Sequence, residues 1–306
     1  MNFNTGGIIR PHRLKPGDTI GIVAPSGPFD GDRFDRGIAL IEEMGFATRF
    51  EESIFSRKGY LAGGDEQRAA RFNAMVADDR VRAIMSARGG YGSMRMLDGL
   101  DYGAITAAAK PFIGFSDVTA LHRAFFLRSG LVTFHGPMVT TLAGSDETSR
   151  LSWYQTLTEP LKAPLDLAGA RTLNPGIVRG RLTGGNLATI CHLTGTTVGA
   201  GFQGCILMLE ETGEALYRID RMLTQMKMAG LFDGMAGLIL GSFDNCGPVD
   251  GIEALVMEIF DGWDIPIVSG APVGHGRSNW TVPLGLEARL DASRRELVFT
   301  EQTFQE

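Results

Sequence analysis

The chain has 306 residues, a formal net charge of -6 and 44% hydrophobic residues, which is typical of a soluble globular protein with one large or two ordinary domains. It contains no long basic run and no apolar stretch of about 18 residues, so neither a nucleic-acid partner nor a membrane span is expected. No apolar segment follows the polar first 16 residues. We therefore expect no secretory signal and predict a cytoplasmic location.

Strands and helices alternate along the first half of the chain. Short apolar runs predict strands, and apolar residues at helical spacing predict helices. The predicted strands are 19–24, 47–50, 81–86 and 111–115, and the predicted helices are 34–44, 65–76, a helix opening at 93–97, and 118–128. This α/β alternation predicts a parallel sheet covered on both faces. Ligands bind beyond the carboxyl ends of such strands, so the loops at Ala24, Arg88 and Ser116 should share one edge.

A boundary is predicted within 143–174, which is polar, has weak periodicity and contains Pro160 and Pro164. The expected division is a first domain at 1–150, a linker at 151–175 and a second domain at 176–306. In the second domain we predict helices at 187–193, 217–229 and 252–260. The predicted strands there are 205–209, 235–240 and 265–273, with further short strands within 285–300.

Ser116 follows an apolar strand and precedes a helix, with Gly114 two residues before it. A serine at such a turn projects its hydroxyl from the sheet edge, where the N–H groups of the next helix favour a developing oxyanion. The match to a G-x-S-x-G nucleophile elbow is incomplete because Val118 stands at the last position. From these residues alone Ser116 is either a nucleophile or the N-cap of the helix, and the cap is the commoner role.

The glycine-rich segment 88–92 ends the preceding strand and is either a tight turn or a source of backbone N–H groups for an oxyanion. A serine nucleophile also needs a base, and His135 and His275 both stand at strand ends. His12 lies in the polar N-terminus, and His122 and His192 fall within predicted helices. The carboxylate that would orient the base is Glu210, Glu211 or Glu214. Glu210 and Glu211 are neighbours on an extended segment and point to opposite faces, so at most one of them faces the site.

No metal and no cofactor are predicted, because no His, Cys or Asp cluster has metal-ligand spacing. Cys191, Cys205 and Cys246 form no CxxC pair. We interpret these three cysteines as buried free thiols.

Several segments together resemble the LD-carboxypeptidases, a family of serine peptidases that includes muramoyltetrapeptide carboxypeptidases and microcin C self-immunity peptidases. Singly they are weak signals, but their order is specific, and the resemblance extends from about Lys15 to about Leu290. The segments are GIVAPSG at 21–27, ARGGYG at 87–92, IGFSD at 113–117, FHGP at 134–137, GGN at 184–186, LEE at 209–211, YRIDR at 217–221, VGHG at 273–276 and PLG at 283–285.

The resemblance implies a Rossmann-like N-terminal domain with a parallel sheet and a smaller β-rich C-terminal domain. It also implies a Ser-Glu-His triad, with Ser116 as nucleophile, Glu210 as orienting acid and His275 as base. The triad would be divided between the domains, with the site in a cleft. The oxyanion hole would consist of the backbone N–H groups of Gly90 and Asp117.

The activity implied is hydrolysis of the L,D-peptide bond that releases terminal D-Ala from murein tetrapeptides, by a homodimer acting in peptidoglycan recycling. Arg88 is a candidate for binding substrate charge or a structural ion-pair partner. Tyr91 and Asn279 are candidates to line the site, with packing or surface placement as the alternative. Two other functions remain open: cleavage of a peptidyl-nucleotide or another amide, for which Trp280 is a candidate stacking residue, and ligand binding without catalysis.

Overall fold

The structure is a computed structural model that describes residues 7–161, 165–167 and 169–305. The described residues pack as two compact units. The N-terminal unit runs to Pro160 and also includes Trp280–Pro283 and the residues from Thr303 onward. The C-terminal unit comprises Leu161–Asn279 and Leu284–Gln302. None of the helices in the described ranges has the length and apolar character needed to cross a membrane.

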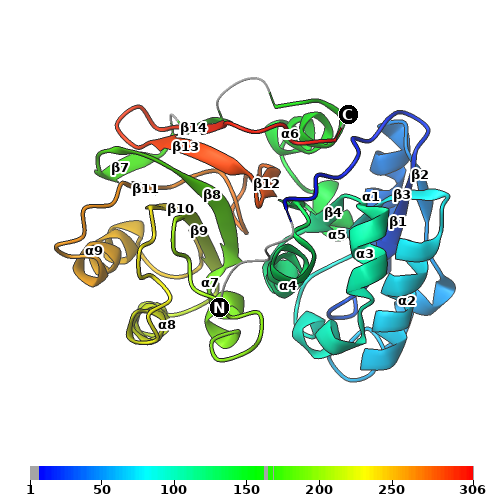
Figure 1. Cartoon of the computed structure of the whole chain (residues 1–306). Helices are drawn as coiled ribbons and strands as arrows, with labels where there is room; N and C mark the ends of the chain where they lie inside the picture. Colours follow the sequence, from blue (N-terminus) through cyan, green and yellow to red (C-terminus); the bar gives the residue numbers. More distant parts are fainter. Residues whose placement is uncertain (1–6, 162–164, 168, 306) are drawn as a thin grey trace. The chain divides into compact units, whose positions relative to one another are not determined.

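The N-terminal unit contains a six-stranded sheet with the strand order β12-β5-β4-β3-β1-β2 (Figure 1). The pairings from β5 through to β2 are parallel, as the alternation of strands and helices predicts. After β2 the chain returns to the other side of β1 to form β3, so the sheet has a switch point between β1 and β3. The strands are β1 Thr19–Val23, β2 Ala47–Arg49, β3 Val81–Ser86, β4 Phe112–Gly114, β5 Thr133–His135 and β12 Val282–Leu284.

Helices cover both faces of this sheet, as predicted (Figure 1). They are α1 Gly31–Glu43, α2 Asp65–Ala77, α3 Tyr102–Ala108, α4 Thr119–Ser129, α5 Val139–Leu142 and α6 Glu147–Thr158, with 3-10 helices at η1 Glu52–Phe55, η2 Ser93–Gly99 and η3 Ser116–Val118. Phe34 of α1 and Trp153 of α6 belong to the hydrophobic cluster on one face. On the other face, Phe72 of α2 and Phe125 of α4 contact Phe112 of β4. These aromatic residues hold the layers together through the burial of apolar area.

The C-terminal unit contains an eight-stranded sheet in the order β6-β14-β13-β8-β9-β10-β11-β7. The four strands β8 to β11 pair in parallel, and the outer strands pair antiparallel. The strands are β6 Leu165–Asp166, β7 Arg171–Asn174, β8 Ile177–Asn186, β9 Cys205–Thr212, β10 Gly237–Asp244, β11 Ile267–Ser269, β13 Glu287–Asp291 and β14 Glu296–Phe299. The helices are α7 Leu187–His192, α8 Leu216–Met228 and α9 Val249–Ile259. The unit is rich in β-structure, as the family resemblance implies.

The stretch 151–175, which the sequence suggests as a linker, contains the end of α6 and the strands β6 and β7. The buried face of α6 consists of Ser149, Trp153, Thr156 and Leu157. Two of these four residues are polar, so the helix has almost no apolar periodicity to detect. The contacts divide the chain between Pro160 and Leu161, just after this helix.

Strand β8 was not predicted because its C-terminal half is rich in glycine, which weakens any strand signal. The structure shows why glycine stands there. A Cβ atom at Gly184 would lie 1.9 Å from the carbonyl oxygen of Met208 in β9, and the φ of Gly184 is +138°. The predicted helix at 93–97 is the 3-10 helix η2, and only 267–269 of the predicted strand 265–273 is extended.

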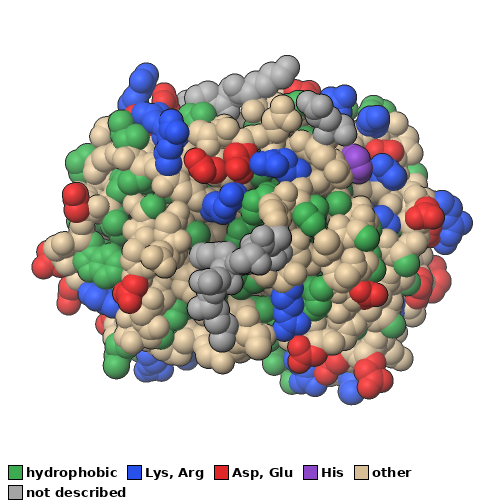
Figure 2. All heavy atoms as spheres, viewed as in Figure 1, with side chains coloured by type: hydrophobic (Ala, Val, Ile, Leu, Met, Phe, Trp, Pro, Cys, Tyr) green, Lys and Arg blue, Asp and Glu red, His purple; other side chains and the backbone are tan. Residues whose placement is uncertain are grey.

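Charged side chains of both signs are mixed on the molecular face shown in Figure 2, with no continuous basic patch on that face. This distribution agrees with the acidic net charge of -6.

Gly37 provides a test of the packing between α1 and α5. A Cβ atom there would lie 2.0 Å from the carbonyl oxygen of Val139, whereas a Cβ atom at Gly31 of the same helix meets nothing within 4 Å. Gly→Ala normally stabilises a helix, but overpacking costs about 1–3 kcal/mol. We expect Gly37→Ala to lower the free energy of unfolding by that amount in urea titrations, and Gly31→Ala to leave it unchanged or raise it. Equal stability of the two variants would contradict the packing described.

Candidate active site

Ser116 stands at the turn where β4 leads into α4, with its backbone in the left-handed region at φ 67°. A residue with a side chain adopts this conformation at a cost of about 1–3 kcal/mol, and such strain gathers at functional sites. Ser116 opens the 3-10 helix η3, whose N-cap is Phe115, and the N-cap of α4 is Val118. The helix-cap alternative for Ser116 is therefore wrong, because other residues cap both helices.

Two glycines leave the room that this turn requires. A Cβ atom at Gly89 would lie 2.8 Å from Cβ and 2.9 Å from Oγ of Ser116. A Cβ atom at Gly114 would lie 2.7 Å from a methyl carbon of Val118. The loop after β3 thus passes directly against the serine because Gly89 has no side chain. The first glycine of the incomplete elbow motif, Gly114, has a steric role of the same kind.

Asp117 is held by hydrogen bonds to both its carboxylate and its backbone carbonyl oxygen. Its carboxylate accepts hydrogen bonds from Oγ of Ser26 at 2.5 Å and from the backbone N–H of Ser93 at 2.8 Å, both to Oδ2. Its carbonyl oxygen accepts a hydrogen bond from Oγ of Ser93 at 2.6 Å. Ser26 and Ser93 are fully buried and Asp117 is 7% exposed. Hydrogen bonds to a buried charged group contribute about 1.5–3 kcal/mol, enough to offset the strain at Ser116.

In the C-terminal unit, His275 and Glu210 form a hydrogen-bonded pair. The distance from Nδ1 of His275 to Oε2 of Glu210 is 2.6 Å. The Glu210 side chain is completely buried, and that of His275 is 20% exposed. A buried carboxylate at Nδ1 fixes the tautomer and the orientation of the ring.

The loop that carries His275 folds over β10 to reach Glu210 on β9. A Cβ atom at Gly241 would lie 2.5 Å from the carbonyl oxygen of Val273, and one at Gly274 would lie 2.7 Å from Oε2 of Glu210. Ser242 of β10 fixes the loop, since its N–H donates to Val273 and its Oγ accepts from the N–H of Gly276. Gly241 and Gly274 therefore allow the loop of His275 to approach the carboxylate closely.

The pKa of His275 lies above its ordinary value of 6.5. Burial by itself lowers it, but the hydrogen bond and the negative charge of Glu210, with smaller contributions from Glu211 and Asp244, outweigh burial. Because the folded pKa is raised, the pair stabilises the fold fully below pH 6.5, and this contribution is lost as the pH rises through the folded pKa.

The other two candidate carboxylates have different partners. Glu211 is buried and accepts hydrogen bonds from the side-chain amide of Asn186 and the N–H of Ala188, at 2.9 and 2.7 Å. Burial raises the pKa of Glu211. Glu214 contacts Arg218. Glu210 and Glu211 therefore point to different partners, as expected for strand neighbours, but neither belongs to a solvated strand end.

His122 and His135 have separate environments. His122 is buried between Thr133 and the carbonyl oxygen of Gly114, at 2.9 and 2.8 Å, and burial lowers its pKa to about 4. It is the packed residue that its place in a helix predicts, and it fixes the strand just before the elbow. His135, the rival base, is also fully buried, and its ring contacts Phe115.

The candidate binding residues around the loop after β3 are exposed. Arg88 donates a hydrogen bond to the carbonyl oxygen of Pro28 at 2.6 Å, which anchors it to the loop after β1. Gly90 has a φ of +111°, a backbone that favours glycine. Tyr91 is 47% exposed, and its ring centroid lies 5.7 Å from that of Tyr60.

Asn279 belongs to the loop of His275 and is 6% exposed. Its Oδ1 accepts a hydrogen bond from the N–H of Gly274 at 2.9 Å. This bond closes the loop on itself around His275. The contact assigns Asn279 a loop-fixing role within its own unit.

The sequence reasoning missed Ser26, Ser93 and the side chain of Asp117. A signal was available, since Ser26 and Ser93 belong to the loops after the first and third strands. Those loops were expected to share an edge with Ser116. Nothing in the sequence shows that both serines bond to one residue.

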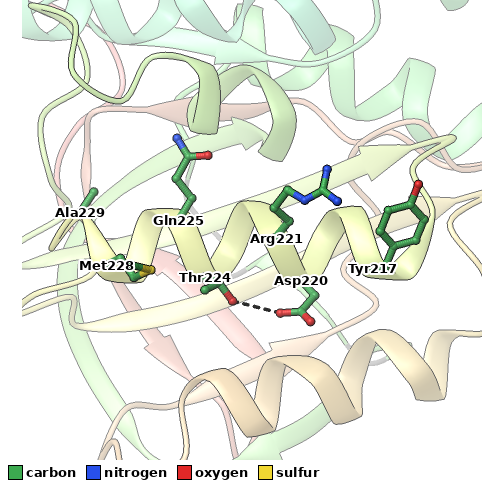
Figure 3. A pocket seen from close by; sticks show the side chains of 7 residues that line it. All are labelled: Tyr217, Asp220, Arg221, Thr224, Gln225, Met228 and Ala229. Atoms are coloured by element: carbon green, nitrogen blue, oxygen red, sulfur yellow. Dashed lines mark hydrogen bonds between the residues drawn. The ribbon is translucent and has the colours of Figure 1, made fainter.

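A separate hollow of about 630 Å³ runs along α8 (Figure 3). Its lining residues all belong to α8 or directly follow it, and within it Thr224 bonds to Asp220. Tyr217 is 59% exposed and lies under Arg221. The hollow is lined by none of the predicted site residues, so we do not assign it to the active site.

The His275–Glu210 pair can be tested without an activity assay. We expect Glu210→Gln to lower the pKa of His275, because the carboxylate charge that raises it is lost. The measurement is an NMR titration of the His275 ring signals. Glu214→Gln is the matched control, since Glu214 bonds to Arg218 and should not affect His275. An unchanged His275 pKa in Glu210→Gln would contradict the explanation that the Glu210 carboxylate raises it.

Two family models match the chain. The LD-carboxypeptidase N-terminal domain matches residues 20–136, which include the elbow. The LD-carboxypeptidase C-terminal domain matches residues 179–290, which include Glu210 and His275. The two matches lie in the same order as the segments on which the sequence resemblance rests.

Known proteins are similar over nearly the whole chain. A murein tetrapeptide carboxypeptidase of Pseudomonas aeruginosa is 31% identical, over 90% of this chain and 94% of its own. The microcin C7 self-immunity protein MccF of Escherichia coli is 30% identical, over 94% and 95%. The crystal structure of a muramoyltetrapeptide carboxypeptidase from Oxalobacter formigenes matches with a TM-score of 0.81 and 28% identity, over 91% and 97%. This chain therefore belongs to the LD-carboxypeptidase family of peptidases.

Proposed function

We propose that the protein is a serine-type LD-carboxypeptidase that releases terminal D-Ala from murein tetrapeptides. The observation that carries the proposal is the left-handed Ser116 at the end of a parallel strand, packed against Gly89. In a nucleophile elbow the serine adopts a strained turn between strand and helix, because that turn exposes its hydroxyl group. The His275–Glu210 pair supports the proposal because it has the hydrogen bond that orients a general base.

In the first half of the reaction, Oγ of Ser116 attacks the carbonyl carbon of the L,D-peptide bond and passes its proton to Nε2 of His275. The oxyanion that forms accepts hydrogen bonds from the backbone N–H groups of Gly90 and Asp117. The C–N bond then breaks, and His275 returns the proton to the leaving amine. The products of this half are free D-Ala and an ester of the tripeptide with Ser116.

In the second half, His275 takes a proton from water as the water oxygen attacks the ester. The ester bond breaks, the proton returns to Oγ of Ser116, and the tripeptide leaves with a free carboxylate. Glu210 stabilises the imidazolium formed in each half through its hydrogen bond to Nδ1. The proposal requires Nε2 of His275 to reach Oγ of Ser116, so activity depends on the two units coming together.

The relatives named as murein tetrapeptide and muramoyltetrapeptide carboxypeptidases support the choice of substrate. A carboxypeptidase must also bind a free terminal carboxylate. Arg88, exposed beside Gly90, is the proposed cation, with Tyr91 and Asn279 as proposed lining residues. We further propose that the enzyme works as a cytoplasmic homodimer in the recycling of peptidoglycan fragments.

The nucleophile is tested by incubating the protein with murein tetrapeptide and measuring released D-Ala. We expect turnover by the wild type and a loss of at least about 1,000-fold in kcat for Ser116→Ala, because no other hydroxyl replaces the nucleophile. Ser129→Ala, which removes a buried hydroxyl at the far end of α4, is the control and should keep full activity. No release by the wild type rejects the substrate, and an active Ser116→Ala rejects the nucleophile.

The base is tested by comparing His275→Ala with His135→Ala. We expect His275→Ala to lose about 1,000-fold in kcat and His135→Ala to stay within about ten-fold of the wild type. The base must be neutral and its pKa is raised, so kcat/KM of the wild type should fall on acidification with a midpoint above pH 6.5. A greater loss in His135→Ala, or an acid midpoint below 6.5, would reverse the assignment.

A second candidate function is cleavage of a peptidyl-nucleotide or another amide by the same residues. The similarity to the microcin C7 self-immunity protein favours this alternative. It predicts that Trp280→Ala raises KM for an aminoacyl sulfamoyl nucleoside while leaving D-Ala release from murein tetrapeptide unchanged. A protein that binds either compound without turnover would instead be a binding module.

A further inference from the structure

Three loops of the N-terminal unit meet at the side chain of Asp117. Ser26 lies in the loop after β1, Ser93 follows the loop after β3, and Asp117 follows β4. We refer to Ser26, Ser93 and Asp117 as the Asp117 clamp. Its hydrogen bonds join positions that are 91 and 24 residues apart in sequence.

The clamp holds both the side chain and the carbonyl oxygen of Asp117. The carboxylate is bound by Ser26 and by the N–H of Ser93, while the carbonyl oxygen is bound by Oγ of Ser93. The N–H group of Asp117 belongs to the peptide unit that follows the strained Ser116. The orientation of that peptide unit therefore depends on how firmly Asp117 is held.

The same contacts reach the loop that carries Gly90. The N–H of Gly27 donates to the carbonyl oxygen of Gly89 at 3.1 Å. Gly27 follows Ser26 in the sequence, and Gly89 precedes Gly90. Two residues beyond Gly90, Gly92 leads into Ser93, where η2 begins. Gly90 therefore lies between two fixed points, the hydrogen bond from Gly27 to Gly89 and the clamp residue Ser93.

We propose that Ser26 and Ser93 are positioning residues that act through Asp117 to align the backbone N–H groups of Asp117 and Gly90 toward the oxyanion. The inference rests on the proposed function, in which these N–H groups stabilise the transition state. The clamp raises kcat rather than substrate affinity, because the oxyanion exists only in the transition state. The Asp117 carboxylate is acceptor-only, faces two donors, and takes no part in the chemistry.

The test compares Ser26→Ala with the wild type in two assays. The first gives kcat and KM for murein tetrapeptide. The second gives the rate at which a fluorophosphonate probe labels Ser116, a reaction in which Oγ bonds to phosphorus, fluoride leaves and the phosphoryl oxygen occupies the oxyanion position. Complete loss of an oxyanion donor costs about 100- to 1,000-fold in kcat, so misalignment should cost less. We expect about a ten-fold fall in kcat and in labelling rate, with KM within two-fold.

Two further variants distinguish positioning from loss of fold. Asp117→Asn keeps one side-chain oxygen that can accept from both Ser26 and Ser93, so it should retain more activity than Asp117→Ala. Ser129→Ala removes a buried serine hydroxyl bonded to Tyr102 in the same unit and should change neither assay. Thermal unfolding of Ser26→Ala within a few degrees of the wild type would show that its losses are not those of an unfolded protein.

The outcomes separate this inference from the proposed function. Labelling of wild-type Ser116 without release of D-Ala rejects the substrate, while the labelling rates still test the clamp. A folded Ser26→Ala with wild-type kcat and labelling rate overturns the clamp and leaves the proposed function standing. A rise in KM with unchanged kcat also overturns it, because the clamp would then act on substrate binding. If Ser116 of the wild type is not labelled, the nucleophile fails and the inference fails with it.

Discussion

The backbone of Ser116 lies in the left-handed region directly after a buried strand, and the surrounding loops are built to hold it there. Such a conformation persists only where the neighbouring structure determines it more strongly than local preference does. Gly89 supplies the space, and Asp117 supplies the attachment through bonds to Ser26 and Ser93. The strand order places the loops after β1, β3 and β4 at one edge, so the fold makes these contacts available.

In the C-terminal unit, too, polar residues meet at the carboxyl ends of parallel strands and glycines leave the room for their contact. Strands β8 to β11 are parallel, and their carboxyl ends bring Glu210 and the loop of His275 to one edge. Gly241 and Gly274 lack the side chains that would separate them. Burial lowers the pKa of His275, but the hydrogen bond and charge of the fully buried Glu210 outweigh it and raise that pKa. The hydrogen bond to Glu210 thus orients the His275 ring.

Much of the site could be predicted from short segments. Ser116, Glu210 and His275 each follow or end an apolar run, and strand ends are where polar residues of an α/β sheet gather. The choice between Glu210 and Glu211 was beyond local reasoning, because both are buried and bonded. The same holds for the helix-cap alternative at Ser116, which depends on a φ angle that no residue pattern reveals. Helix α6 escaped prediction because Ser149 and Thr156 occupy its buried face.

The sequence by itself determined the α/β alternation, the parallel first sheet, the β-rich second half and the family, because apolar periodicity and ordered motifs are properties of the linear chain. Only the tertiary structure decided that Asp117 is bound by two serines from distant loops, that Glu210 rather than Glu211 bonds to His275, and that Gly89 touches Ser116. These contacts join residues from 24 to 91 positions apart. Their partners are selected by strand order and register, which local patterns do not encode.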